Sequence, residues 1–201
     1  VVNTVNYVRD QLGGTQADVA WMLAASGGGT LLVALFLPRL LDRIAERVVM
    51  MTGAFVLLAG VLAAVAMTAA QAISWTITAP IWVAIGGGMA LIVTPTGRVI
   101  RGSAPKHELP AAFAAQFSLS HLAWLITYPI AGWVGTASGF TLAWSILAAL
   151  AITGAIAAQM LWPREKRTKA IVDGTDAETA TGDLALREET EAAEGTLAAS
   201  Q

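Results

Sequence analysis

Long apolar stretches without an ionised side chain dominate the chain up to about residue 165. A helix needs about 20 apolar residues to cross a hydrocarbon core of about 30 Å. On that criterion the pattern predicts a remnant helix at residues 1–8 and full spans near residues 19–38, 48–70, 76–97, 109–135 and 140–162. The spans 48–70 and 76–97 come from one continuous apolar stretch, which polar positions between residues 71 and 78 divide.

These stretches lack the polar stripe that a surface helix of a soluble protein carries. Such a helix shows polar residues with a period of 3.6, whereas the segment Leu57–Met67 has no polar side chain. Hydrophobic residues make up 56% of the sequence and charged residues only 13%, against about 25% charged residues in soluble domains. We therefore predict an all-α fold, a polytopic transmembrane helix bundle formed by residues 1–165.

Basic residues gather on one side of the predicted spans. Ten Lys and Arg residues fall in the segments that follow the spans 19–38, 76–97 and 140–162, whereas the other side carries only Arg9. Cytoplasmic loops of membrane proteins carry such an excess. We expect a multi-pass protein of a bacterial-type inner (plasma) membrane, with its C-terminus in the cytoplasm. Its basic loops suit the anionic surface of a lipid bilayer and not a nucleic acid.

The end of the chain has a different composition. Eight of the fourteen acidic residues lie between Asp173 and Glu194, where large apolar residues are scarce. A segment of that kind cannot bury a core of its own. We therefore predict that residues 166–201 form a disordered, acidic, cytoplasmic tail.

A motif after the first full span gives a clue to function. The segment Leu37–Arg47 (LPRLLDRIAER) resembles the cytoplasmic signature of the major facilitator superfamily, G-x-L-x-D-R-x-G-R-R. Pro38, Ala45 and Glu46 depart from it, and the matching positions are Leu40, Asp42, Arg43 and Arg47. In the family the acid pairs with helix-end amides and basic side chains, since a carboxylate is favoured at a helix N-terminus. The alternative is a plain basic loop with a solvated Asp–Arg pair.

The order of the spans extends this resemblance. Five spans after a remnant, with the signature behind the second of the set, look like helices seven to twelve of the superfamily, the carboxy-terminal half with its first helix truncated. The segment Phe113–Gly135 is also loosely similar to bacterial efflux-type permeases related to nickel-resistance proteins. The resemblance implies an amino-terminal half of the same carrier as partner, and we expect residues 1–201 alone not to transport.

Two glycine triplets lie inside predicted spans, at Gly27–Gly29 and Gly86–Gly88. Small residues let membrane helices approach one another closely, and glycine also permits a helix to bend. Close packing and a gating hinge are therefore the two interpretations of these triplets.

Polar side chains at membrane depth usually face the bundle interior or a wet cavity, because exposing them to lipid is costly. At about 100° per residue, one sector of the span 109–135 collects polar and aromatic side chains. We predict that this face lines a substrate cavity, and the candidates are Gln116, Ser120, His121, Trp124 and Tyr128, with Asn3 and Asn6 on the remnant helix. The alternative for His121 is a buried histidine satisfied by a neighbouring helix.

Together these features predict a secondary active transporter that exports a small solute or ion by alternating access, with protons as the candidate coupling ion. No Asp, Glu, Lys or Arg lies within the spans, so ion coupling would fall to His121 or to the other half, unless the carrier is a facilitator. A non-transporting membrane subunit or assembly factor is the alternative. We expect no enzyme, cofactor or metal site, because titratable and metal-ligating residues are not clustered.

Overall fold

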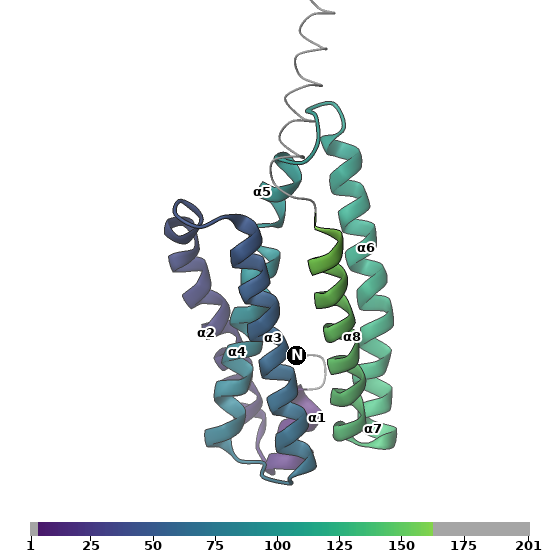
Figure 1. The fold of residues 1–201 in the computed structure, drawn as a ribbon. Coiled ribbons are helices and arrows are strands. Elements are labelled where there is room, and N and C mark those ends of the chain that lie inside the picture. Colours follow the sequence, from purple (N-terminus) through teal and green to yellow (C-terminus); the bar gives the residue numbers. More distant parts are fainter. Residues whose placement is uncertain (1–3, 163–201) are drawn as a thin grey trace, which may run out of the picture. The chain divides into compact units, whose positions relative to one another are not determined.

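The computed structural model describes residues 4–162, and every regular element in that range is helical (Figure 1). The elements are α1 (Thr4–Leu12), α2 (Gln16–Leu41), α3 (Glu46–Ala69), α4 (Trp75–Val93), α5 (Thr96–Arg101), α6 (Leu109–Pro129), the π-helix η1 (Ile130–Val134), α7 (Gly135–Ser138) and α8 (Phe140–Leu161). Asn3 and the predicted tail at residues 166–201 lie outside the described residues.

Within residues 4–162, five helical segments are long and apolar enough to cross a membrane. They are Gln16–Leu41, Glu46–Ala69, Trp75–Arg101, Leu109–Ser138 and Phe140–Leu161. The predicted fold class, an all-α polytopic transmembrane bundle, is therefore confirmed.

Helix α2 begins before the apolar pattern that predicts it, because polar residues cap its first turn. The backbone N–H and the hydroxyl of Thr15 donate to the Asp18 carboxylate at 2.6 and 2.8 Å, and the Asp18 N–H donates back to Thr15 Oγ1 at 3.4 Å. This reciprocal capping box satisfies donors that a helix start leaves open. The apolar residues mark the part of α2 that suits lipid, whereas the cap sets where the helix starts.

The fourth predicted span continues past residue 135. Pro129 closes α6, and the chain then passes through the π-helical turn η1 and the short helix α7. Proline lacks a backbone N–H and interrupts the regular hydrogen-bond ladder. Gly139 ends the segment with a φ of 94°, a conformation that glycine adopts without steric cost, and so turns the chain into α8.

The chain divides into two compact units. Among the described residues, the larger unit comprises residues 4–97 and 115–162, and the smaller comprises residues 98–114. In the described part of the smaller unit, the Gly102 N–H donates to the Arg98 carbonyl at 3.1 Å and so closes the helical turn. In the same part, His107 Nε2 lies 3.7 Å from a carboxylate oxygen of Glu108.

In the larger unit, α4 packs between α2 and α3, and α3 packs against α8 (Figure 1). Arg47 Nη2, at the start of α3, donates to Gln159 Oε1, near the end of α8, at 3.2 Å. The start of α3 therefore meets the end of α8, as expected for an antiparallel pair. No residue of α6 is buried.

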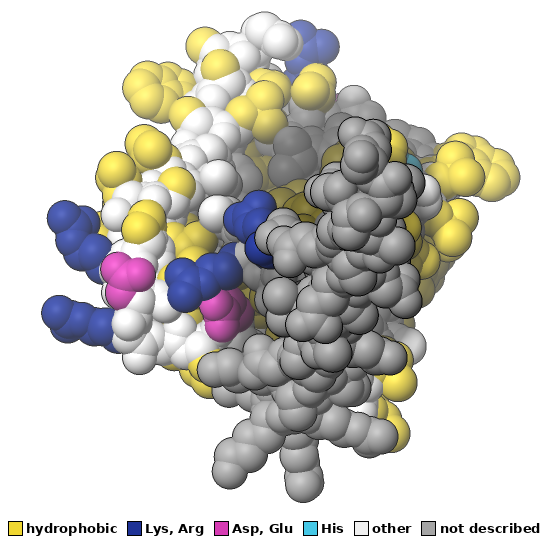
Figure 2. All heavy atoms as spheres, turned by 90° about the horizontal axis from the view of Figure 1, so that it is seen from above, with side chains coloured by type: hydrophobic (Ala, Val, Ile, Leu, Met, Phe, Trp, Pro, Cys, Tyr) yellow, Lys and Arg dark blue, Asp and Glu magenta, His cyan; other side chains and the backbone are white. Residues whose placement is uncertain are grey.

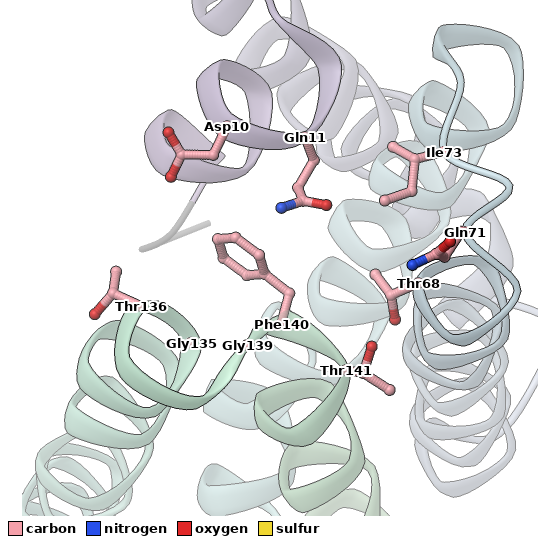
Figure 3. Close-up of a pocket in the computed structure, with 10 residues that line it drawn as sticks. All are labelled: Asp10, Gln11, Thr68, Gln71, Ile73, Gly135, Thr136, Gly139, Phe140 and Thr141. Carbon is pink, nitrogen blue, oxygen red and sulfur yellow. The ribbon is translucent and has the colours of Figure 1, made fainter.

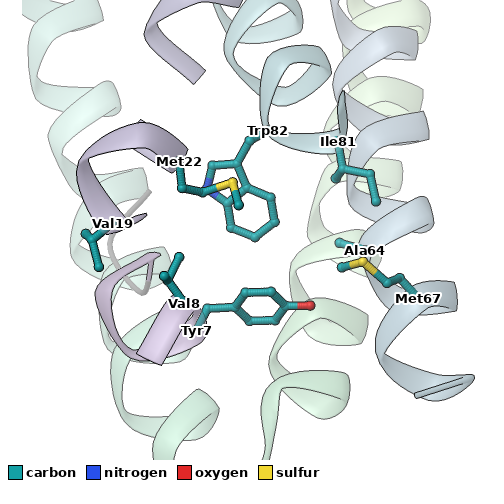
Figure 4. Packing of buried hydrophobic residues seen from close by; sticks show 8 residues of the cluster. All are labelled: Tyr7, Val8, Val19, Met22, Ala64, Met67, Ile81 and Trp82. Atoms are coloured by element: carbon teal, nitrogen blue, oxygen red, sulfur yellow. The ribbon is translucent and has the colours of Figure 1, made fainter. Parts of the chain in front are cut away.

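The short helix α1 is part of the core and not a loose end. Tyr7 and Val8 are 1% and 0% exposed, and they pack with side chains of α2, α3 and α4 (Figure 4). The Tyr7 ring lies 5.2 Å from the ring of Trp82 and meets Phe140 edge-to-face at 5.1 Å. The Trp82 indole N–H donates to the Thr4 hydroxyl at 3.1 Å. The helix runs to Leu12, four residues beyond the predicted remnant, and so includes Arg9 and Asp10.

Glycines set how closely α4 approaches both of its neighbours. A Cβ atom on Gly86 would overlap the Ser26 carbonyl oxygen of α2, and one on Gly88 would lie 2.6 Å from the Leu57 nitrogen of α3. A Cβ atom on Gly29 would likewise overlap the Val83 carbonyl oxygen of α4. The Thr30 hydroxyl adds an interhelical hydrogen bond to the Gly86 carbonyl at 3.2 Å. These contacts favour close packing over the hinge interpretation, since both triplets lie in uninterrupted helices.

Candidate functional site

The predicted polar face of α6 contains two groups of side chains in contact. Gln116 Nε2 donates to Ser120 Oγ at 2.9 Å, and that hydroxyl donates to the Gln116 carbonyl at 2.9 Å. Further along the helix, the His121 and Trp124 rings lie 4.8 Å apart, and Trp124 stacks on Tyr128 with centroids 6.0 Å apart. Contacts about one helical turn apart therefore join Gln116 with Ser120 and, separately, His121 with Trp124 and Tyr128. We call these five residues the polar row on α6.

The imidazole of His121 has one nitrogen engaged and one available. Nδ1 lies 2.8 Å from the Phe117 carbonyl oxygen, and because a carbonyl can only accept, Nδ1 carries the proton. Nε2 is then an acceptor in the neutral ring and a donor in the charged ring. The Phe117 ring packs on the imidazole with centroids 3.9 Å apart. His121 can therefore exchange a proton or a hydrogen bond with a solute through Nε2.

The aromatic part of this face is exposed, and the rest of it is half-buried. His121 is exposed, Trp124 and Tyr128 are 42% and 49% exposed, and Gln116 and Ser120 are half-buried. Within residues 4–162, the hydrogen-bond partner of the exposed His121 belongs to its own helix, so this is not a buried histidine satisfied by a neighbouring helix. Leu119, on the opposite side of α6, is 66% exposed. The two sides of α6 therefore differ in their chemistry, and Gln116 and Ser120 on the polar side are more covered than Leu119.

The other predicted cavity residues lie on or before α1. Asn6 is exposed on that helix, between the exposed Val5 and the buried Tyr7. Asn3 is outside the described residues.

The signature segment forms the turn between α2 and α3. Leu40 is half-buried in the last turn of α2, and the Asp42 N–H donates to the Pro38 carbonyl at 3.2 Å. The carboxylate of Asp42 makes no hydrogen bond or ion pair with the residues that the structure describes, whereas the resemblance implies helix-end partners for it. Arg43 is exposed, and Arg47 instead reaches Gln159 on α8. Figure 2 looks onto this end of α2 and α3 and shows basic side chains beside acidic and apolar ones.

A pocket that the sequence pattern did not indicate lies where α1, the end of α3 and the corner between α7 and α8 meet (Figure 3). Its volume is about 580 Å³. The lining residues are Asp10, Gln11, Thr68, Gln71, Ile73, Gly135, Thr136, Gly139, Phe140 and Thr141. They come from separate parts of the chain and form no motif, so only the tertiary structure brings them together.

Comparisons with known proteins place the chain in a family. The family model described as "Major Facilitator Superfamily" matches residues 1–194. The match extends beyond residue 165, where the predicted helix bundle ends, and so includes most of the predicted acidic tail at residues 166–201. Neither the search of curated proteins nor that of solved structures gave a match. With a family match over nearly its whole length and five helices able to span a membrane, this chain belongs to the major facilitator superfamily of membrane transporters.

Proposed function

We propose that the chain forms the carboxy-terminal half of a secondary active transporter that exports a small solute or ion by alternating access. In this proposal α1 to α8 supply helices seven to twelve, and an amino-terminal half of the same carrier supplies the other wall of the cavity. Carriers of this kind bind their substrate near the bilayer midplane, where the two repeats meet. The direction of transport rests on the similarity of Phe113–Gly135 to bacterial efflux-type permeases, among them nickel-resistance proteins.

The observation that carries the proposal is the polar row on α6, none of whose residues is buried. Helices α2, α3 and α4 pack on one another, and α8 packs on α3, whereas α6 buries none of its residues. A row of amide, hydroxyl, imidazole and indole groups facing lipid would be costly. A second half packed across this row would enclose it in a cavity, where the same groups could contact a solute.

His121 is the residue that we propose to couple solute transport to the movement of a proton. Of the two histidines in residues 4–162, His121 lies inside a membrane-spanning segment and His107 does not. The Nε2 atom of His121 is available to a solute, because the hydrogen bond to its own helix uses Nδ1. Imidazoles change their charge within the physiological pH range, so one of them can carry a proton across part of the cavity. No group of three or more metal-ligating side chains occurs in the described residues, and we therefore propose no metal as the substrate.

The proposal is tested by measuring flux in proteoliposomes under an imposed pH gradient. The chain reconstituted with an amino-terminal half should drive proton-linked uptake of a cationic dye at least tenfold faster than residues 1–201 alone. The physical reason is that one half supplies only one wall of the cavity. Equal flux from residues 1–201 alone would instead indicate a carrier built from copies of this chain.

The orientation in the membrane is a second testable part of the proposal. The contact between Arg47 and Gln159 joins the α2–α3 turn to the end of α8. We propose that this end faces the cytoplasm of a bacterial-type inner membrane, because cytoplasmic loops carry an excess of Lys and Arg. Because the chain has no cysteine, single cysteines can be introduced at Thr136 and Lys169. An impermeant maleimide added to intact cells should label position 136, and it should label position 169 only after permeabilisation. The reverse pattern would overturn this orientation.

A further inference from the structure

The pocket beside α1 has the size of a small-molecule site. Its volume is about 580 Å³, within the range of about 300 to 1,000 Å³ typical of ligand pockets. In Figure 3, Gln11 and Phe140 point toward one another across the pocket, with Thr68 and Gln71 on one side of them and Asp10 and Thr136 on the other. Hydroxyl and carboxamide groups therefore surround an aromatic ring.

The pocket carries a negative charge and therefore favours a positively charged ligand. Asp10 is the ionised side chain among its ten lining residues, which include no Lys, Arg or His. The neighbouring base, Arg9, donates instead to Gln16 Oε1 at 3.1 Å. In the described residues the Asp10 carboxylate makes no hydrogen bond or ion pair. The pocket therefore offers an open negative charge to a ligand.

Other features favour an organic cation over a metal ion. A divalent ion such as Ca²⁺ takes six to eight oxygen ligands, usually from several carboxylates, whereas this pocket has one carboxylate and room for a molecule of several atoms. The half-buried Phe140 ring lies in the pocket (Figure 3). An aromatic face attracts quaternary ammonium groups within about 6 Å of its centroid.

Contacts with residues outside the pocket hold two of its lining side chains, Phe140 and Thr68, in position. The Phe140 ring packs edge-to-face on the buried Tyr7 at 5.1 Å, and the Thr68 hydroxyl donates to the Ala64 carbonyl at 2.8 Å. Gln71 has a φ of 53°, an uncommon left-handed conformation for a residue other than glycine. Strained backbone of this kind concentrates at ligand sites.

We propose that this pocket binds a small organic cation with an ammonium group, held between the Asp10 carboxylate and the Phe140 ring, at a site separate from the polar row on α6. Binding here does not depend on the proposed transport function. The proposed orientation adds only that the site opens on the side opposite the cytoplasm, since it lies at the other end of α3 and α8 from the Arg47–Gln159 contact.

Calorimetry with residues 1–201 in lipid nanodiscs tests the site, with choline as the probe. Choline should bind saturably, and Asp10→Asn should weaken its binding at least tenfold. The matched control Asp42→Asn removes an exposed acid from the α2–α3 turn and should leave choline binding unchanged. Asp10→Asn should fold normally, because Asp10 is exposed and an acid is unfavourable near a helix C-terminus.

A labelling experiment gives a second readout that does not rely on Asp10. A cysteine at Thr141, which is exposed in the pocket, should react with maleimide at least threefold more slowly in saturating choline than in the same concentration of sodium chloride. Unsaturable binding, equal choline affinity in Asp10→Asn and the parent chain, or Mg²⁺ binding as tightly as choline would overturn the proposal. None of these outcomes would bear on flux through the cavity beside α6.

Discussion

Replacing Gly86 with alanine is expected to destabilise the bundle by about 3 kcal/mol, at the upper end of the usual cost of overpacking. The added Cβ would overlap the carbonyl oxygen of Ser26 and lie 2.9 Å from its hydroxyl oxygen. The carbonyl belongs to the backbone of α2, so no change of rotamer can make room, and the two helices must move apart. That movement would also break the hydrogen bond from Thr30 to the Gly86 carbonyl.

The matched control is Gly27→Ala in the first triplet. A Cβ on Gly27 meets nothing within 4 Å, and alanine favours a helix interior over glycine by about 1 kcal/mol. This variant should therefore be as stable as the parent chain or slightly more stable. Thermal unfolding in detergent, followed by far-ultraviolet circular dichroism, compares the two variants. Equal midpoints for both would show that the α2–α4 approach is not limited by Gly86.

Replacing His121 with alanine is expected to lower proton-linked flux at least tenfold in the carrier assembled from both halves, with its abundance in the membrane unchanged. The imidazole is exposed, and its hydrogen bond is to its own helix, so the fold loses little. Transport loses the group that we propose to contact the solute or carry the proton. His121→Gln separates these roles, because glutamine retains hydrogen bonding but does not titrate.

Leu119→Ala is the control for His121→Ala on the same helix. Leu119 lies on the opposite side of α6 and is 66% exposed. Its replacement should leave both flux and abundance close to the parent values. If flux survives in His121→Ala, or falls equally in Leu119→Ala, then the polar row on α6 is not the wall of the transport cavity.

The interactions of the α6 row could be anticipated because they are local. Gln116 and Ser120, and likewise Trp124 and Tyr128, are four residues apart, and a helix places such pairs on one face whatever surrounds it. The same reasoning could not find the pocket. Asp10, Gln71 and Phe140 lie in different elements, and nothing in their spacing indicates that α1, the end of α3 and the start of α8 meet.

Apolar length and a local signature were enough to predict the helical fold class and the resemblance to the superfamily, because neither depends on the rest of the molecule. In contrast, the sequence could not tell which of several residues of the same type make contacts between helices. Gly27 and Gly29 belong to one triplet, yet only Gly29 would clash with α4 if it had a side chain. Likewise, Arg47 bonds with Gln159 across 112 residues of sequence. The physical reason is that such contacts depend on how each helix is rotated against its neighbours, and that rotation is fixed by the packing of all of them together.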